Sequence, residues 1–276
     1  WLLMTSEVNS PLKGAPGRPF LALAASVLLV TGCASDSEFV VQGEAQGSTF
    51  VVRAYGDSLN LSESDVARWL ADYNKAVSAW DPQSELSRLN RGEVVATTPV
   101  FDELLLVAEG IRTATDSLVE PALEPVLRAW GFTAGTQLLP SPQGPRRDSA
   151  IVDSLMALVR WARPETTTAG TRLAHPINVN AFAQGHSVDL VLDSLRARGA
   201  TAAFVEIGGE VRCFGLKPNG NVFKVGIEKP LTSGDRSVQL TVELEDRALA
   251  TSGNYRKNQV DSATGQRYGH SLDPST

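Results

Sequence analysis

The segment Asn178–Asp189 places a polar strand end, two alanines and a glycine directly before an amphipathic pattern that predicts a helix to about Gly199. Ala181, Ala183 and Gly185 would let another group approach the backbone closely. The N-terminus of a helix has free N–H groups, which attract anions such as phosphate. Close packing between elements is the commoner reason for such a segment, so it is a candidate phosphate site only in combination with other motifs.

Two further groups of polar residues lie near the end of the chain. Thr251 and Ser252 precede a glycine, and their hydroxyl and N–H groups are suited to phosphate oxygens. His270 and Asp273 are titratable and could move a proton, although a His/Asp pair this general is often incidental. The sequence contains no P-loop, nucleophile elbow or His/Cys metal motif. These residues alone indicate no more than an α+β domain with a possible phosphate-contacting site.

Composition sets the class of protein. The 276 residues are 42% hydrophobic, enough for a substantial core, and the net charge of −6 gives no electrostatic reason to expect nucleic-acid binding. The two cysteines, Cys33 and Cys213, do not form a disulfide framework of the kind found in small secreted domains.

The first 33 residues have the pattern of an export signal, with Met4 as the expected start. Lys13 and Arg18 precede the apolar run Phe20–Val30, which is too short to span a membrane stably, and small residues then lead to Cys33. We expect residues 1–33 to be a signal peptide with a lipobox and Cys33 to be lipidated, before a single domain over 34–276. An ordinary signal peptide with a chance cysteine, or a short membrane anchor, are the alternatives.

Hydrophobic periodicity predicts the elements that must position the polar residues. Alternation predicts a strand pair over 39–55, and a capping box at Ser62 starts a helix that is expected to stop at Asp81-Pro82. Further helices are predicted from Thr98 and over Ile151–Trp161. Later strands are predicted at Ala202–Ile207, Val211–Phe214, Val222–Ile227 and Val238–Leu244. Helices early and strands late favour an α+β fold.

Three other segments have two interpretations each. The segment Ser84–Asn90 can be a capped helical turn or part of a site. Trp130 and Phe132 can line a wall or pack in the core, and Thr133–Asp148 is expected to be a surface insertion or hinge because it is rich in glycine and proline.

Seven motifs follow one another after Val40 and cover nearly all of the remaining chain: Gln46–Phe50, Trp80–Asn90, Glu120–Phe132, Asn178–Asp189, Glu206–Glu210, Thr251–Arg256 and Tyr268–Thr276. In this order they resemble the ApbE family of FAD:protein FMN transferases. The resemblance implies an α+β, T-fold-like domain with largely antiparallel sheets flanked by helices, and a groove for FAD between its sub-regions.

The resemblance also implies an activity. Such proteins use FAD and Mg²⁺ to attach FMN to a Thr or Ser hydroxyl of a partner protein, with release of AMP, while related members hydrolyse FAD to FMN and AMP. The partner would be a redox subunit of a membrane complex, of the Na⁺-translocating NADH:quinone reductase or Rnf type. The protein itself would be lipid-anchored and face the periplasm, and Ala34 after the lipobox would favour the outer membrane.

Site residues follow from the resemblance by position. FAD would be contacted by Gln46, Trp80, Leu118, Val119, Glu120, Asn178, Gln184, Thr251, Ser252 and His270. The carbonyl of Ala181 would bind Mg²⁺, and His270 and Asp273 are the candidates for catalysis. Trp80 could equally pack in the core on its helix face.

Four positions depart from the family pattern: Gln184 replaces a usual lysine, His186 a tyrosine, Gln46 a methionine and Asn178 an aspartate. A charged hydrogen bond is about twice as strong as a neutral one, so Gln184 would weaken binding to the pyrophosphate. The family's Mg²⁺-binding Asp and Thr lie beyond the last motif. We therefore expect either a fragment of a longer reading frame or a protein without its main metal ligands, and poor activity as it stands. A non-catalytic FAD-binding lipoprotein and an FAD pyrophosphatase are the alternatives.

Overall fold

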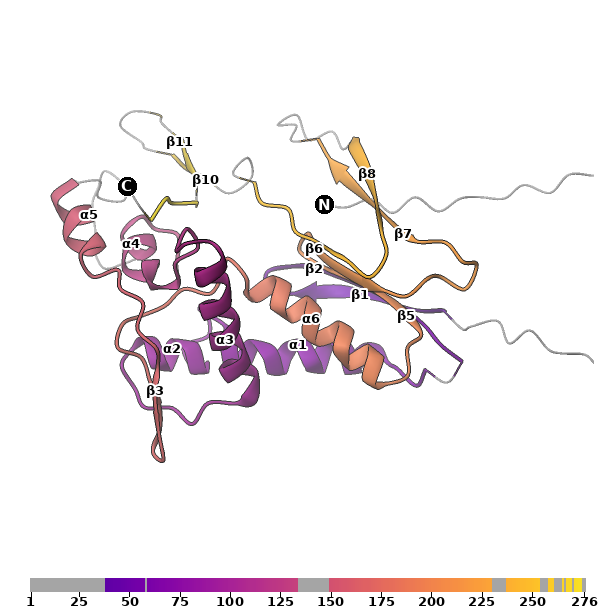
Figure 1. Cartoon of the computed structure of the whole chain (residues 1–276), viewed down its shortest axis with the longest axis horizontal. Coiled ribbons are helices and arrows are strands. Elements are labelled where there is room, and N and C mark those ends of the chain that lie inside the picture. The colour runs from indigo at the N-terminus through magenta and orange to yellow at the C-terminus, as the bar shows by residue number, and fades with distance from the viewer. Residues whose placement is uncertain are drawn as a thin grey trace, which may run out of the picture.

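The computed structural model describes residues 38–57, 59–133, 149–229, 237–253, 258–260, 265, 267–269 and 271–274 (Figure 1). The predicted signal peptide with Cys33, most of the predicted insertion, and His270 lie outside these residues. Among the described helices, none has the length and apolar character needed to cross a membrane.

A strand pair comes first, most of the helices follow it, and most of the strands lie after α6. The helices are α1 (Glu63–Val77), α2 (Glu85–Asn90), α3 (Pro99–Ala114), η1 (Pro121–Leu123), α4 (Glu124–Ala129), α5 (Ser149–Met156) and α6 (Ala183–Ala197). The strands are β1 (Glu38–Ala45), β2 (Ser48–Tyr55), β3 (Glu165–Thr167), β4 (Gly170–Arg172), β5 (Ala202–Ile207), β6 (Glu210–Phe214), β7 (Phe223–Glu228), β8 (Val238–Leu244), β9 (Ala248–Leu249), β10 (Asn258–Val260) and β11 (Arg267–Gly269). The predicted α+β class is confirmed.

The central sheet is antiparallel and has the order β1-β2-β5-β6-β9. Strand β2 pairs with β5 from Phe50 opposite Ile207 to Tyr55 opposite Ala202. This pairing joins residues about 150 positions apart, so a strand predicted near the start of the domain lies beside one predicted in its last third.

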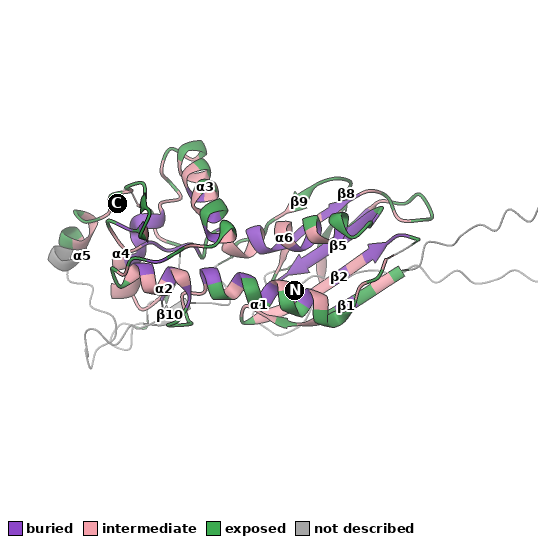
Figure 2. Cartoon of the chain, turned by 90° about the horizontal axis from the view of Figure 1, so that it is seen from below, coloured by how far each residue is buried: buried purple, intermediate pink, exposed green. Residues whose placement is uncertain are grey.

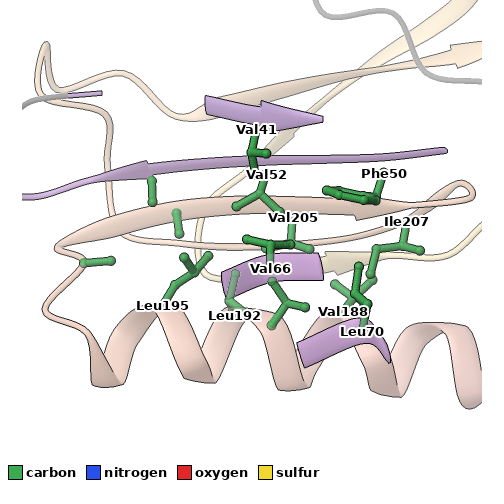
Figure 3. Packing of buried hydrophobic residues seen from close by; sticks show 14 of the residues in the cluster. Val41, Phe50, Val52, Val66, Leu70, Val188, Leu192, Leu195, Val205 and Ile207 are labelled. Atoms are coloured by element: carbon green, nitrogen blue, oxygen red, sulfur yellow. The ribbon is translucent and has the colours of Figure 1, made fainter. Parts of the chain in front are cut away.

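Both faces of the sheet are covered (Figure 1). Ala203, Val205 and Ile207 of β5 point to the face packed by α1 and α6, where Figure 3 shows the side chains interlocked. Ala202 and Phe204 point to the other face and pack with the β7–β8 hairpin. Every residue of β5 is therefore buried, which is why its sequence is an almost continuous apolar run.

A second core lies beside the sheet among the helices. Its largest fully buried members include Tyr73, Phe101 and Leu104. Helix α1 contributes to both cores, because its first half packs on the sheet and its second half packs on α2 and α3 (Figure 2). Helix α6 likewise begins among the helices and ends beneath the sheet.

The predicted capping box of α1 is confirmed, but the predicted end of this helix is wrong. Ser62 and Asp65 exchange hydrogen bonds, and those from Ser62 and Arg68 lower the pKa of Asp65 to about 2. The helix ends at Val77 rather than at Asp81-Pro82, because Ser78 Oγ accepts the N–H groups of Trp80 and Asp81 and turns the chain. Trp80 is therefore not on a helix face.

Other predictions have mixed outcomes. The segment Ser84–Asn90 is a capped helical turn, since Ser84 caps α2. Helix α3 starts after Thr98 with proline at its first position, as predicted. Helix α5 ends at Met156, shorter than the predicted Ile151–Trp161, and the side chains described there are not buried. Val152, Leu155 and Met156 are only half-buried, so tertiary packing gives little support to a longer helix.

Candidate functional site

Two tight turns meet at one end of the central sheet. Gln46 and Gly47 join β1 to β2 with φ values of 54° and 70°, and Gly208 and Gly209 join β5 to β6 with φ values of 60° and 103°. Positive φ at both central residues is the requirement of a type I′ hairpin, which suits glycine. The Gly208 N–H donates to the Thr49 carbonyl over 3.0 Å, so the two turns are hydrogen-bonded side by side.

The first turn of α6 packs against both hairpins. Ser187 Oγ lies 2.7 Å from the Gln184 carbonyl and 3.2 Å from Gln46 Oε1. The Gln184 side chain covers the second turn, since a Cβ placed on Gly208 would lie 2.1 Å from Gln184 Nε2. The structure thus brings together two predicted site residues, Gln46 and Gln184, which are far apart in the chain.

Gln46 also carries an unsatisfied group. Its Nε2 is buried and has no hydrogen-bond partner among the described residues. An unpaired buried donor costs about 1–3 kcal/mol, and a bound acceptor is one way to recover that free energy.

The segment that leads into α6 is held at three points. Asn90 exchanges two hydrogen bonds of 2.9 Å with the backbone of Ile177. The Asn178 N–H donates to the Pro121 carbonyl over 2.7 Å. Tyr73 donates from its hydroxyl to the Ala183 carbonyl over 2.8 Å and lies 3.1 Å from His186 Nδ1. These contacts fix the start of the helix from three different elements.

The polar atoms of the Asn178 side chain bind the protein itself. Its Nδ2 donates to Glu124 Oε2 over 2.8 Å, and its Oδ1 accepts the Asn180 N–H over 3.0 Å. Asn178 is buried. Its observed contacts are therefore those of a residue that holds the segment, and its predicted contact with FAD stays a prediction.

Ala181 lies exposed in the turn before α6. Within the described part of the chain, no backbone hydrogen bond ends on its carbonyl oxygen. A free carbonyl is a ligand of the type that Mg²⁺ accepts. The described residues contain no group of three or more His, Cys, Asp or Glu side chains that could hold a metal ion, so the carbonyl suits the ion but does not form a site by itself.

The other predicted contacts lie on neighbouring surfaces. Glu120 caps η1 by accepting the Ala122 N–H, and it pairs with Arg112 over 2.8 Å.

The apolar residues predicted to contact FAD are exposed. Leu118 is 63% exposed and Trp80 is 69% exposed, so the alternative that Trp80 packs in the core is wrong. Thr251, Ser252 and Asp273 are also exposed, and Trp130 and Phe132 are half-buried. Among the described contacts, none joins Trp80 or Leu118 to Gln46, Gln184 or Ser187.

Several residues of this site were not predicted. Ser187 links α6 to the first hairpin, Gly208 supports Gln184, and Glu124 and Tyr73 hold the segment before the helix. A pair of glycines between two short strands was a usable signal for Gly208. The partners of Glu124 and Tyr73 lie 54 and 110 positions away, and no local pattern indicates them.

Burial raises the pKa of two carboxylates, Glu206 and Glu210, which flank the turn between β5 and β6. Desolvation raises the pKa of Glu206, although the Gly209 N–H donates to this carboxylate over 2.7 Å. Desolvation raises the pKa of Glu210 as well. The ionised forms are therefore costly here, as expected for carboxylates withdrawn from water.

We predict that Glu206→Gln raises the melting temperature at pH 7. Because the pKa of Glu206 is raised in the folded state, its contribution to stability is present below the ordinary pKa and is lost as pH rises through the folded value. The gain of the variant should thus shrink as pH falls below the ordinary value. Thermal unfolding of both proteins across pH would check this, with the exposed Glu44→Gln as control. A lower melting temperature for Glu206→Gln at pH 7 would contradict it.

Comparisons with known proteins agree with this arrangement. The model of the ApbE family matches residues 46–276. A FAD:protein FMN transferase of Vibrio cholerae is 32% identical, over 94% of this chain and 78% of its own length. One of Haemophilus influenzae is 27% identical, over 91% of this chain and 76% of its own.

Solved structures give the same result. The apo flavinyl transferase ApbE of Pseudomonas stutzeri superposes with a TM-score of 0.69 at 28% identity, covering 87% of this chain and 75% of that one. The flavin transferase ApbE of Vibrio cholerae also has a TM-score of 0.69, at 26% identity, covering 87% and 77%. The chain belongs to the ApbE family.

Proposed function

We propose that this protein is an FAD:protein FMN transferase that moves FMN from FAD to a Thr or Ser hydroxyl of a partner protein. The family match over residues 46–276 is the observation that carries the proposal. In the reaction, the hydroxyl oxygen bonds to the phosphorus of the FMN half, the bond from that phosphorus to the AMP phosphate breaks, and the hydroxyl proton leaves. The products are flavinylated protein and AMP.

The start of α6 has the features that a pyrophosphate needs. Small residues there leave the backbone open, and the positive end of the helix favours an anion. Gln184 has an amide that can donate to a phosphate oxygen, while Gln46 has a buried amide without a partner among the described residues. Trp80 presents an exposed aromatic face, which suits a flavin ring.

The proposal includes Mg²⁺, with the Ala181 carbonyl as one ligand. When bound, the ion would neutralise charge on the pyrophosphate. Thr251 and Ser252 are proposed to bind phosphate oxygens, and His270 and Asp273 are proposed to take the hydroxyl proton.

The location and the partner are also proposals. The basic, apolar and small residues before Cys33 support export and a lipid anchor at that cysteine, facing the periplasm. The acceptor would then be an exported or membrane redox protein, with the Na⁺-translocating NADH:quinone reductase and Rnf complexes as the proposed hosts.

The test incubates the full-length protein with FAD, Mg²⁺ and an acceptor that contains Asp-Gly-x-Thr/Ser-Gly-Ala-Thr/Ser. We expect the mass of the acceptor to increase by one FMN, and we expect EDTA or an alanine at the acceptor hydroxyl to prevent this. Free FMN and AMP without acceptor would identify a pyrophosphatase instead. FAD binding with neither product would identify a flavin-binding lipoprotein, the alternative that glutamine at position 184 permits.

A further inference from the structure

Glu124 is a buried carboxylate at the start of α4, and its side chain is only 4% exposed. Its two oxygens have different partners. Oε1 accepts from Arg128 Nη2 over 2.8 Å, and Oε2 accepts from Asn178 Nδ2 over 2.8 Å. A carboxylate withdrawn from water in this way is costly unless such hydrogen bonds compensate it. The ion pair with Arg128 is within one helix, whereas the bond to Asn178 reaches the segment before α6.

The bond to Glu124 determines how the Asn178 amide is oriented. A carboxylate only accepts hydrogen bonds, so the amide must direct its NH₂ group toward Glu124. The amide oxygen then faces the Asn180 N–H, which donates to it over 3.0 Å. With the opposite orientation, two oxygens would face each other at Glu124 and two donors would face each other at Asn180.

The Asn180 N–H lies at the start of the turn that presents Ala181. In that turn the Phe182 and Ala183 N–H groups donate to the Val179 carbonyl, and α6 follows directly. The hydrogen bond from Asn180 to Asn178 Oδ1 is an Asx-turn, a local contact that sets backbone direction. A buried charge on α4 is thus connected through one side chain to the backbone at the start of α6.

We propose that Glu124 is a positioning residue of the flavin transferase, which acts through Asn178 to hold the Asn180–Phe182 turn and the Ala181 carbonyl. This inference rests on the proposed function. An aspartate accepts the Asn180 N–H in either orientation, but an asparagine needs a fixed partner, and Glu124 is that partner.

The test exchanges the two groups. In Glu124→Gln the new amide no longer selects one orientation of Asn178, and we expect FMN transfer to fall about tenfold, as for loss of an outer-shell partner. Asn178→Asp alone places two carboxylates in contact, so activity should fall further and recover partly at acid pH, when the pair shares a proton. The double variant Glu124→Gln/Asn178→Asp restores one carboxylate and one amide, and should regain most of the lost activity.

A second readout does not depend on activity. Hydrogen exchange of the amides in 178–184 should be faster in Glu124→Gln than in the wild type, and slow again in the double variant. Arg128→Gln is the matched control, because it removes the ion pair but leaves the bond to Asn178. It should leave exchange in this segment unchanged.

The outcomes separate the two proposals. A wild-type protein that transfers no FMN would contradict the proposed function, while the exchange experiment would still test the positioning role. Wild-type exchange and transfer in Glu124→Gln would overturn the inference. If Glu124→Gln does not fold, a double variant no better than Asn178→Asp would overturn it equally.

Discussion

Replacing Gly208 by alanine is expected to lower the rate of FMN transfer by about 100-fold, the effect of misplacing a substrate-positioning group by about 1 Å. The new Cβ would lie 2.1 Å from Gln184 Nε2 and 2.9 Å from its Cδ, so the Gln184 side chain must leave the turn. Ser48 Oγ, at 3.1 Å, closes the other side. The backbone adds strain, since φ is +60° and a left-handed conformation costs a non-glycine residue about 1 kcal/mol.

A matched control separates the clash from the strain. Gly220 has φ of +78°, and a Cβ added there would meet no atom within 4 Å, so Gly220→Ala adds strain alone. It should cost about 1 kcal/mol of stability and keep the transfer rate. In Gly208→Ala/Gln184→Ala the clash with Gln184 is gone and only the tight contact with Ser48 Oγ remains, so stability should recover most of the way to that of Gly220→Ala while transfer stays low. Normal transfer by Gly208→Ala would show that the Gln184 position has no role.

The elements of this fold were predictable where one local signal dominates. Ala202–Ile207 was predicted with the observed bounds because a strand covered on both faces has a continuous apolar run. The start of α1 was predicted because the Ser62–Asp65 capping box is local. The end of α1 was not, because Val77 and Trp80 continue the helical spacing while the Ser78 hydroxyl turns the backbone.

The candidate site was predictable in part. The motifs placed Gln46 and Gln184 in one site, and the structure brings both to the first turn of α6. The hydrogen bonds that hold the Asn180–Phe182 turn before α6 were not predictable. In the sequence Glu124 is one of two glutamates beside prolines, and only the fold places it next to Asn178. Periodicity indicates which face of an element is buried, but it does not indicate which polar partner lies there.

The two hydrophobic cores are expected to unfold together. Val66 and Leu70 of α1 pack on the sheet, while Tyr73, one turn later, packs among the helices. Leu190 of α6 packs against both cores. Because two helices each belong to both cores, neither core can lose its packing without disturbing the other.

Leu192→Ala and Phe101→Ala test this, since each residue is fully buried in a different core. Figure 3 shows Leu192 between α6 and the sheet. We expect losses of about 2–5 kcal/mol for Leu192→Ala and about 3–5 kcal/mol for Phe101→Ala. The exposed Leu118→Ala should change stability by less than about 0.5 kcal/mol.

Denaturant unfolding followed by hydrogen exchange would monitor the two cores separately. Each variant should lower the midpoint equally in β5 and in α3, although each substitution lies in only one core. A fall confined to the substituted core would show that α1 and α6 do not couple them. If the cores are coupled in this way, the first turn of α6 opens only with the free energy of global unfolding, because the helix that carries Gln184 is anchored in both cores.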